Sequence, residues 1–398
     1  MPDHDTTKNY RYIEMTKNQK FSTIKYPEID QATAFVDSAA IVNNIKIAQS
    51  IAPAAKIMAV VKANGYGHGM VNVAKILAPY IHGYAVARYE EAQTLRDQSI
   101  TKEILIMSPT SNLEQLHSYP SNNYIAAVHT LEMLEFAQKI TDLNYWVKID
   151  TGMHRLGISR DNTHLLFDDS TLNTRPKAIM THFSEAQKEH SIATNKQMQH
   201  FINVFEKNDI DAFSVSNSAA IMINENSDGY PQWQLQKTTQ LAGRQEFIRP
   251  GIMIYGIDPL DKANQTSLEL QPAMTFTAPI ISIKPINAGE SVGYNSKWIA
   301  SKKSIIATIA VGYADGYPRH AKNGTPVLVN GKLATLVGAV SMDSLSVDIT
   351  DHHEHIKIGD TAILWGKELP INIIARHANT IAYDLMTAIA ERVAREII

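Results

Sequence analysis

A lysine followed by a glycine-rich turn is the first feature of the sequence that could do chemistry. The stretch AVVKANGYGHG, residues 59–69, places Lys62 directly after an apolar run and just before Tyr66. A lysine that leaves a buried strand is partly desolvated, which lowers the pKa of its amine and suits it to form a Schiff base. An ordinary solvated surface amine is the alternative for the same residue.

Two loops offer a place for an anion such as a phosphate. They are the stretches SNSAA, residues 216–220, and RPGI, residues 249–252, and each presents backbone N–H groups in a loop that leads toward a helix or a turn. Either stretch alone could be ordinary turn chemistry. Together with a reactive amine they indicate a site for an anionic ligand.

The composition excludes several classes of function. The 398 residues are 44% hydrophobic, and 37 Lys and Arg against 40 Asp and Glu leave a formal net charge of -3. This balance gives no general attraction to nucleic acid, and no segment approaches the roughly 20 apolar residues that span a bilayer. With no cysteine, the chain has no disulfide, thiolate metal ligand or cysteine nucleophile. We expect a small-molecule ligand, no metal and a cytoplasmic location.

Short apolar stretches alternate with helix-like stretches through most of the chain. We expect eight strands, which begin at residues 56, 84, 103, 124, 145, 177, 213 and 252, the last being IMIYG. Eight alternating units predict an α/β fold, a parallel (β/α)8 TIM barrel over residues 33–270. An open doubly wound sheet is the alternative, but the G-x-G-x-x-G turn that it should carry is absent.

The two ends of the chain differ from this pattern. Residues 1–32 are polar, lack the apolar core of a signal peptide and predict a loose N-terminal extension. Strands linked by Gly and Pro turns predict a mostly β C-terminal domain over residues 271–398. Its last stretch, residues 384–397, has the spacing of an amphipathic helix that closes the domain.

The predicted barrel brings the polar residues together. Chemistry in such barrels takes place at the carboxyl ends of the strands and on the loops that follow them. Several candidates fall at these positions, so that one cavity could contain them all: Lys62, Arg155, His182, Asn217, Ser218 and Arg249.

The order of the stretches carries a resemblance to a known family. From about residue 33 onward the sequence resembles alanine racemase, a pyridoxal-phosphate enzyme of the barrel type, in the stretches AVVKANGYGHG, KIDTGMHRLGI, THF, SNSAA, RPGIMIYG, VGYADGY and SMDS. The resemblance implies an isomerase that interconverts L-alanine and D-alanine. It also implies pyridoxal 5'-phosphate as the cofactor and a role in supplying D-alanine for cell-wall peptidoglycan.

The resemblance implies a role for each residue around the cofactor. Lys62 would carry the cofactor covalently, His182 would lie against the pyridine ring, and Arg249 would face the ring nitrogen. A permanently charged arginine disfavours a proton on that nitrogen, so the ring stabilises a carbanion less and positioned acid and base groups are needed. The phosphate would be held by Tyr66, Ser218, Gly251 and Ile252.

By the same resemblance, two bases serve the two faces of the substrate. Lys62 is one, and the other is Tyr294, donated by the second domain of a partner subunit in a homodimer. Arg155 would be the charge and hydrogen-bond partner of this phenol and of the substrate carboxylate. The pocket would be closed from the partner side by three residues, of which the first two could instead be packing residues: Tyr313, Met342 and Asp343.

Some positions leave details open. Lys148 matches a lysine that is carbamylated in part of the family, and a plain ion pair is the alternative. Ser214 stands where a histidine usually bonds the ring-facing arginine, and Gln187 stands where an aspartate is usual. Glu391 and Ala394 replace a tyrosine and a proline of the family pattern. None of these departures removes a catalytic group.

Three other functions on this barrel are alternatives. Racemases for serine or basic amino acids differ from alanine racemases at the pocket entrance. Decarboxylases of basic amino acids rely on a cysteine, and this chain has none. A protein that carries pyridoxal phosphate without turnover lacks the second domain that this sequence predicts.

Overall fold

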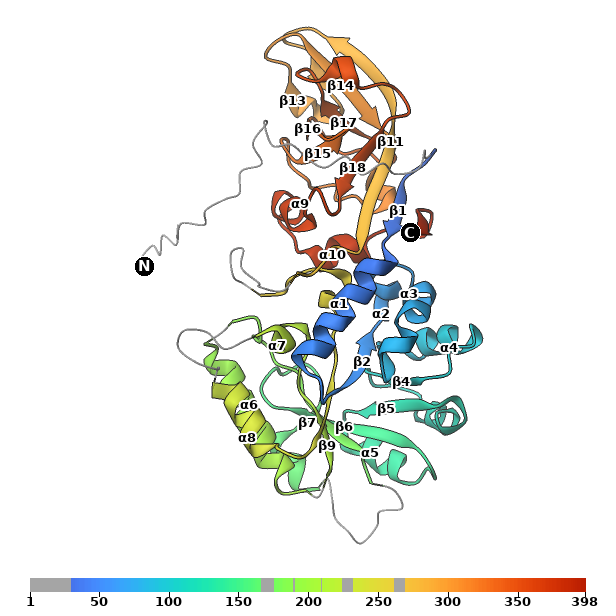
Figure 1. Ribbon diagram of the computed structural model, residues 1–398, viewed down its shortest axis with the longest axis vertical. Helices are drawn as coiled ribbons and strands as arrows, with labels where there is room; N and C mark the ends of the chain where they lie inside the picture. Colours follow the sequence, from blue (N-terminus) through green and yellow to red (C-terminus); the bar gives the residue numbers. More distant parts are fainter. Residues whose placement is uncertain (1–29, 166–174, 189, 209, 224–231, 261–268) are drawn as a thin grey trace.

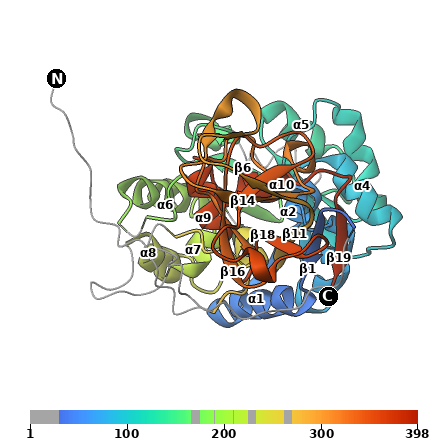
Figure 2. The same cartoon turned by 90° about the horizontal axis from the view of Figure 1, so that it is seen from above.

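The computed structural model describes residues 30–165, 175–188, 190–208, 210–223, 232–260 and 269–398 (Figure 1). Most of the predicted N-terminal extension, residues 1–29, lies outside the described residues. A barrel fills the lower half of Figure 1 and a mostly β domain the upper half. Figure 2 looks down on this arrangement, with the orange and red elements of the second domain over the blue and green barrel.

The predicted eight-stranded parallel barrel is confirmed. The strands follow the ring β2-β3-β4-β5-β6-β8-β9-β10, and the pairings of β5 with β6 and of β10 with β2 complete it. A two-residue strand, β7 (Ile158–Ser159), adds to the edge of β6. The barrel strands are β2 (Lys56–Val60), β3 (Gly83–Val86), β4 (Glu103–Ile106), β5 (Tyr124–Val128), β6 (Asn144–Asp150), β8 (Ala178–Met180), β9 (Ala212–Ser214) and β10 (Gln245–Ile248).

Helices follow most of these strands and cover the outside of the barrel. Side chains start several of them: Asp37 accepts the N–H of Ala40 at 2.9 Å, and Ser191 accepts that of Thr194 at 3.0 Å. The helices are α1 (Ser38–Ile51), α2 (Lys62–Tyr66), α3 (Met70–Leu77), α4 (Tyr89–Asp97), α5 (Leu131–Gln138), α6 (Ile192–Phe205), α7 (Ser218–Met222) and α8 (Gln232–Gln240).

The eighth barrel strand lies elsewhere than the sequence predicts. The prediction at residues 252–256 is wrong, because Ile252–Tyr255 form a 3-10 helix and the strand is β10. All four residues of this helix are buried, and an uninterrupted apolar run does not distinguish a buried strand from a buried helical turn. The strand β10 escaped notice because it contains Glu246, whose carboxylate pairs with Lys237 at 3.0 Å.

The second domain is built on one eight-stranded sheet. Its order is β14-β17-β16-β15-β18-β11-β1-β19, and a further pairing of β14 with β11 closes six of these strands into a ring. A short hairpin, β12 (Ser291–Val292) and β13 (Trp298–Ile299), projects from it. The strands are β1 (Thr33–Val36), β11 (Met274–Ile286), β14 (Ser304–Ile309), β15 (Pro326–Val329), β16 (Lys332–Leu336), β17 (Leu345–Asp348), β18 (Thr361–Trp365) and β19 (Ala394–Ile397).

The two ends of the described chain meet in this sheet. Residues 33–36, which the sequence analysis assigned to the barrel, form β1 and pair with β11 and β19. The predicted closing helix over residues 384–397 is wrong, since α10 (Ala382–Thr387) ends early and β19 follows it. Helical spacing misled here because β1, from the other end of the chain, supplies the backbone partners that make residues 394–397 a strand.

Two helices of the second domain, α9 (Ile371–His377) and α10, lie between its sheet and the barrel (Figure 1). The helix α10 packs against α2, which carries the lysine. No helix in the described part of the chain is long and apolar enough to cross a membrane. Among the same residues, no group of three or more His, Asp or Glu side chains is placed to hold a metal ion.

Candidate active site

One cavity of about 910 Å³ lies at the carboxyl ends of the barrel strands. The structure brings together around it nine of the residues that the sequence singles out: Lys62, Tyr66, Lys148, Arg155, His182, Ser218, Arg249, Gly251 and Ile252. Asn217 and Gln187 also line it. The four residues expected from a partner subunit do not: Tyr294, Tyr313, Met342 and Asp343.

The turn after Lys62 has an unusual backbone. Ala63, Asn64 and Tyr66 have φ values of 52°, 54° and 50°, which is the left-handed region. This conformation costs roughly 1–2 kcal/mol per residue for a side chain other than glycine, so contacts must hold it. The carboxylate of Glu91 accepts the N–H of Ala63 at 2.7 Å, and the side chain of Asn64 accepts the N–H of Met70 at 2.9 Å.

Residues of the second domain also contact this turn, at Gly67. Gly67 has a φ of 81°, and a Cβ atom there would lie 2.0 Å from the carbonyl oxygen of Met386 on α10. Only glycine fits this approach. Arg395 of β19 donates to the carbonyl oxygen of Gly67 at 2.8 Å. The glycine-rich sequence after Lys62 is therefore where the barrel and the second domain meet.

The amine of Lys62 is held in a form suited to reaction. Burial lowers its pKa from the ordinary value of 10.5, the positive charge of Arg155 lowers it further, and Glu91 opposes them. A lower pKa leaves more of the amine unprotonated, and therefore nucleophilic, near neutral pH.

Ser218, Gly251 and Tyr66 meet at one end of the cavity. The hydroxyl of Ser218 accepts the N–H of Gly251 at 2.8 Å and that of Met253 at 3.4 Å. A Cβ atom on Gly251 would come within 2.8 Å of the Tyr66 hydroxyl, so the close approach requires glycine. Hydroxyl and backbone N–H groups concentrated in this way are the kind of donors that bind an anion.

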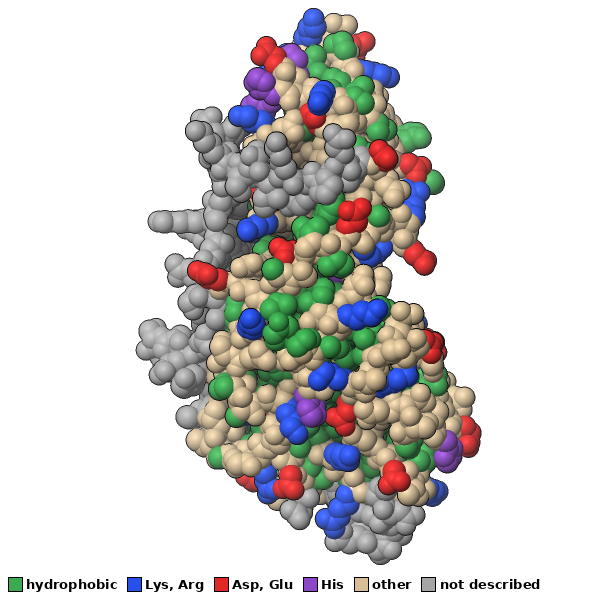
Figure 3. Space-filling model, turned by 45° about the vertical axis from the view of Figure 1, so that its right-hand side comes forward, with side chains coloured by type: hydrophobic (Ala, Val, Ile, Leu, Met, Phe, Trp, Pro, Cys, Tyr) green, Lys and Arg blue, Asp and Glu red, His purple; other side chains and the backbone are tan. Residues whose placement is uncertain are grey.

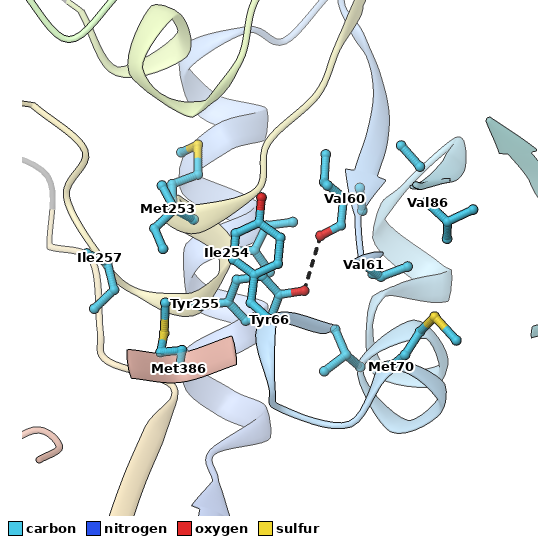
Figure 4. Packing of buried hydrophobic residues seen from close by; sticks show 14 of the residues in the cluster. Val60, Val61, Tyr66, Met70, Val86, Met253, Ile254, Tyr255, Ile257 and Met386 are labelled. Atoms are coloured by element: carbon cyan, nitrogen blue, oxygen red, sulfur yellow. Dashed lines mark hydrogen bonds between the residues drawn. The ribbon is translucent and has the colours of Figure 1, made fainter. Parts of the chain in front are cut away.

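The aromatic ring of Tyr66 is fixed by its neighbours (Figure 4). It stacks on Tyr255 with the ring centroids 4.9 Å apart, and the Tyr255 hydroxyl donates to the carbonyl oxygen of Val60 at 3.1 Å. Burial raises the pKa of Tyr66, so its phenol stays protonated and can donate a hydrogen bond to an anion.

Tyr383 is a residue of the cavity that the sequence analysis missed. It lies on α10, lines the cavity, and its ring centroid is 5.9 Å from that of Tyr66. Burial raises its pKa to about 12, so it too is a neutral donor. A tyrosine on a six-residue helix has no periodic signal in the sequence, and only domain packing brings it here.

Arg249 is buried beneath the cavity, with an exposed fraction of 3%. Its guanidinium donates to the carbonyl oxygen of Thr181 at 2.8 Å and to the hydroxyl of Ser214. Burial lowers its pKa to about 10, and the charge of Glu246 opposes this effect. The arginine therefore stays positive at neutral pH, and Ser214 is a direct partner despite its departure from the family pattern.

Lys148 and His182 share the surroundings of this arginine. Burial, followed by the charge of Arg249, lowers the pKa of Lys148 to about 8 and holds that of His182 well below its ordinary range. His182 is therefore neutral at pH 7. Among the described residues Lys148 has no hydrogen bond and no carboxylate within 4.0 Å, so the plain ion pair considered for it is not formed.

Arg155 reaches the cavity from the loop that follows β6. The carboxylate of Asp150 accepts the N–H groups of Gly152 and His154, both at 3.0 Å, and pins the start of this loop. Gly157 ends it with a φ of 124°, and a Cβ atom there would lie 2.7 Å from the backbone nitrogen of Asp150. The tight loop holds an otherwise exposed arginine at the edge of the cavity.

Comparisons with known proteins agree with this geometry. A model of the alanine racemase N-terminal domain matches residues 36–259, and one of the C-terminal domain matches residues 273–397. Alanine racemase from Photobacterium profundum is 39% identical over 374 residues, which cover 91% of this chain and 98% of that protein. The chain belongs to the alanine racemase family. Membership makes it an isomerase, an amino-acid racemase.

Solved structures of alanine racemases have the same architecture. Biosynthetic alanine racemase from Pseudomonas aeruginosa has a TM-score of 0.80 at 34% identity, covering 93% of this chain and 100% of that one. Alanine racemase from Bartonella henselae, solved with covalently bound pyridoxal phosphate, has a TM-score of 0.81 at 27% identity and the same coverage.

The racemase carries its remaining candidate residues on the second domain, where they face outward. Tyr294, Tyr313 and Met342 are 69%, 37% and 54% exposed. The backbone N–H of Tyr313 donates to the carbonyl oxygen of Ser341 at 3.1 Å, and that of Ala314 donates to the carbonyl oxygen of Met342 at 2.9 Å. These hydrogen bonds join the loop of Tyr313 to the loop of Met342.

An arginine braces the same loops. Arg392 pairs with Asp315 and with Asp343, each at 2.7 Å. Asp343 is thus engaged in an ion pair within its own chain, next to Met342.

Proposed function

We propose that this racemase binds pyridoxal phosphate through Lys62 and interconverts L-alanine and D-alanine with two bases. The bases are Lys62 of one subunit and Tyr294 of the partner subunit. The observation that carries the proposal is a single cavity in which a desolvated lysine amine lies beside a cluster of hydroxyl and backbone N–H donors. The covalently bound pyridoxal phosphate of the Bartonella henselae enzyme supports the choice of cofactor.

The lining of the cavity fits an anionic cofactor and a carboxylate substrate. Among the described residues that line it, Asp384 is the one carboxylate. The Lys and Arg side chains that line it are Lys62, Lys148, Arg155 and Arg249. Ser218, Tyr66 and Tyr383 offer hydroxyl groups, and the missing side chain at Gly251 lets the Tyr66 hydroxyl approach this end of the cavity. We assign the phosphate to this end of the cavity.

When bound, pyridoxal phosphate supplies a conjugated electron-withdrawing ring that acidifies the α-proton of an amino acid. We assign Arg249 to the ring nitrogen and His182 to the ring face. Because Arg249 keeps its charge at neutral pH, a proton on a neighbouring nitrogen is disfavoured. The ring would then withdraw electrons only weakly, so the reaction would require proton carriers already in place on both faces of the substrate.

Lys62 is the proton carrier on one face of the substrate. Its lowered pKa leaves it able to accept the α-proton near neutral pH. Arg155, at the edge of the same cavity, binds the substrate carboxylate and forms a hydrogen bond with the phenol of Tyr294 of the partner subunit. In each direction one base removes the α-proton from its face, and the protonated form of the other base delivers a proton to the opposite face.

The proposal requires a homodimer with shared sites. Tyr294, Tyr313 and Met342 are exposed and lie outside the cavity of their own chain, which supports their use by a second copy. Figure 3 shows hydrophobic side chains gathered around the middle of one face, next to several Lys and Arg side chains, as expected for a contact surface.

Further parts of the proposal concern Lys148 and the cell. A buried, unpaired lysine whose pKa is about 8 is unprotonated often enough to react with carbon dioxide, and we propose that Lys148 is carbamylated beside Arg155. We also propose that the enzyme acts in the cytoplasm and supplies D-alanine for cell-wall peptidoglycan. Its similarity to bacterial alanine racemases supports this role.

The direct test follows the circular dichroism of pure L-alanine, D-alanine and L-serine incubated with the purified protein and pyridoxal phosphate. Both alanine signals should decay to zero, and the serine signal should decay much more slowly. Stable alanine signals would contradict the proposal, and faster loss of the serine signal would favour a racemase of different specificity.

A second measurement locates the cofactor. Borohydride reduction followed by peptide mass spectrometry should find pyridoxal phosphate fixed on Lys62. An adduct on a different peptide would show that a residue other than Lys62 carries the cofactor.

A further inference from the structure

Glu91 joins the turn after β2 to the turn after β3. It lies in the first turn of α4, and one oxygen of its carboxylate accepts the N–H of Ala63 at 2.7 Å. The other oxygen accepts the N–H of Ala87 at 2.7 Å and that of Arg88 at 3.1 Å. One carboxylate therefore binds three backbone groups from two neighbouring loops of the barrel.

The first of these bonds fixes the direction in which the lysine side chain leaves the backbone. The N–H of Ala63 belongs to the peptide plane that it shares with Lys62, so a bond to this group orients the plane next to the lysine Cα. Ala63 also begins the left-handed run of the turn, which an unsupported chain of this sequence would not hold.

The negative charge of the Glu91 carboxylate also acts on the amine of Lys62. Glu91 raises the pKa of Lys62 against burial and against the charge of Arg155. The other titratable groups that line the cavity around Lys62 are Tyr66, Lys148, His182 and Arg249 from the barrel, and Tyr383 and Asp384 from α10. Asp384 already accepts a hydrogen bond from Thr380 at 2.7 Å.

We propose that Glu91 is a positioning residue for Lys62, holding the backbone from which the lysine projects and balancing the positive charges that face its amine. The proposal rests on the proposed role of Lys62 as cofactor ligand and base. Glu91 does not line the cavity, so it acts on the reaction only through the lysine.

The test compares Glu91→Gln, Glu91→Asp and a control, Glu90→Gln, which changes an exposed carboxylate on the same helix. In each full-length protein, freed of cofactor, the pH midpoint of Lys62 acetylation is measured by peptide mass spectrometry. Glu91→Gln keeps the size of the side chain and loses its charge, so its midpoint should move to lower pH. Glu91→Asp keeps the charge and should move the midpoint much less.

Kinetics of the cofactor-loaded proteins separate position from charge. Aspartate is too short to bridge both loops, so Glu91→Asp and Glu91→Gln should both lower kcat about tenfold to a hundredfold with little change in KM. Glu90→Gln should match the wild type in midpoint and in kcat.

A wild-type midpoint in Glu91→Gln, or a wild-type kcat in Glu91→Asp, would overturn the proposal. If Glu91→Gln does not fold, the kcat of Glu91→Asp alone decides it. The acetylation midpoint needs no racemase activity, so failure of the proposed function, seen as an inactive wild type, is distinguished from failure of this inference.

Discussion

The barrel and the second domain present their candidate residues in opposite ways. On the barrel, Arg249 and Lys148 are buried; burial lowers the pKa of both, and the charge of Arg249 lowers that of Lys148 further. On the second domain, Tyr294 and Met342 are exposed and do not line the barrel cavity of their own chain. Under the proposed function, the barrel carries an enclosed half of a site, and the second domain carries an open half that another copy would complete.

The largest expected effect comes from the enclosed half. Lys62→Ala removes both the cofactor ligand and one base, so racemisation should fall by at least about 10⁴-fold in both directions. Borohydride should then fix no pyridoxal phosphate at this position. Lys75→Ala, a change of an exposed lysine on α3, is the control and should keep full activity. Residual activity close to the wild type would remove Lys62 from the mechanism.

Removing the phenol of the open half should lower racemisation nearly as much, but it should abolish α-proton exchange for only one enantiomer. Tyr294→Phe leaves the cavity of its own chain unchanged, and racemisation should fall about 10²–10⁴-fold in both directions. Exchange of the α-proton with deuterated solvent, followed by NMR, should persist for D-alanine and be lost for L-alanine. Equal residual exchange from both enantiomers would assign the second face to a different group.

Mixing the two inactive proteins tests whether the halves come from different chains. A one-to-one mixture of Lys62→Ala and Tyr294→Phe subunits that exchange freely should regain roughly a quarter of the wild-type activity, since half of the dimers are hybrids with one intact site of two. Each protein incubated alone is the control. Demonstrated subunit exchange without recovered activity would place both halves of a site in one chain.

The buried charge of Lys148 predicts a pH-dependent cost to stability. Its folded-state pKa of about 8 lies below the ordinary 10.5, so the unfolded chain holds the extra proton between these values and the free energy of unfolding rises over this range. The cost is fully present below pH 8. In buffer free of carbon dioxide, Lys148→Met should therefore raise the free energy of unfolding by up to about 3 kcal/mol at pH 7, and the gain should shrink toward pH 10.5.

Urea unfolding at several pH values measures the Lys148 effect. Lys139→Met, at an exposed site in the same barrel, serves as the control and should show no such pH dependence. A gain that stays constant from pH 7 to pH 10 would mean that Lys148 is not the titrating group.

The smallest predicted effect concerns the support of Arg249. Ser214→Ala removes one acceptor of a buried guanidinium, which should cost about 2 kcal/mol of stability, and it should weaken cofactor binding by about tenfold. Urea unfolding and titration with pyridoxal phosphate measure the two quantities. Unchanged values for both would show that the carbonyl oxygen of Thr181 alone holds the arginine.

The chemistry of the site was largely readable along the chain. Lys62, Arg155 and Ser218 each stand in a short stretch after a predicted strand, and the parallel barrel that the alternating pattern predicts brings such ends to one side. Arg249 follows a strand only in the structure, because the predicted eighth strand began after it. Strands linked by Gly and Pro turns also predicted the change to a β domain. These features depend on residues close together in the sequence, where type and spacing suffice.

Features that depend on contacts between residues far apart in the sequence were not predicted. The apolar run at residues 252–256 was mistaken for a strand, because burial looks the same for a strand and for a helical turn. Residues 394–397 became a strand only because β1 offers its edge. Tyr383 and Glu91 meet the lysine turn through packing of α10 and α4, and neither has a local signal.

Amino-acid type and order settled which groups this chain has for chemistry, because a side chain's acidity, charge and reach are local properties that position along the chain already displays. The folded packing settled how those groups behave. The pKa of Lys62 depends on burial, on Arg155 from the loop that follows β6 and on Glu91 from α4. Free energies of desolvation and charge interaction depend on distance in space, and only the tertiary structure sets those distances.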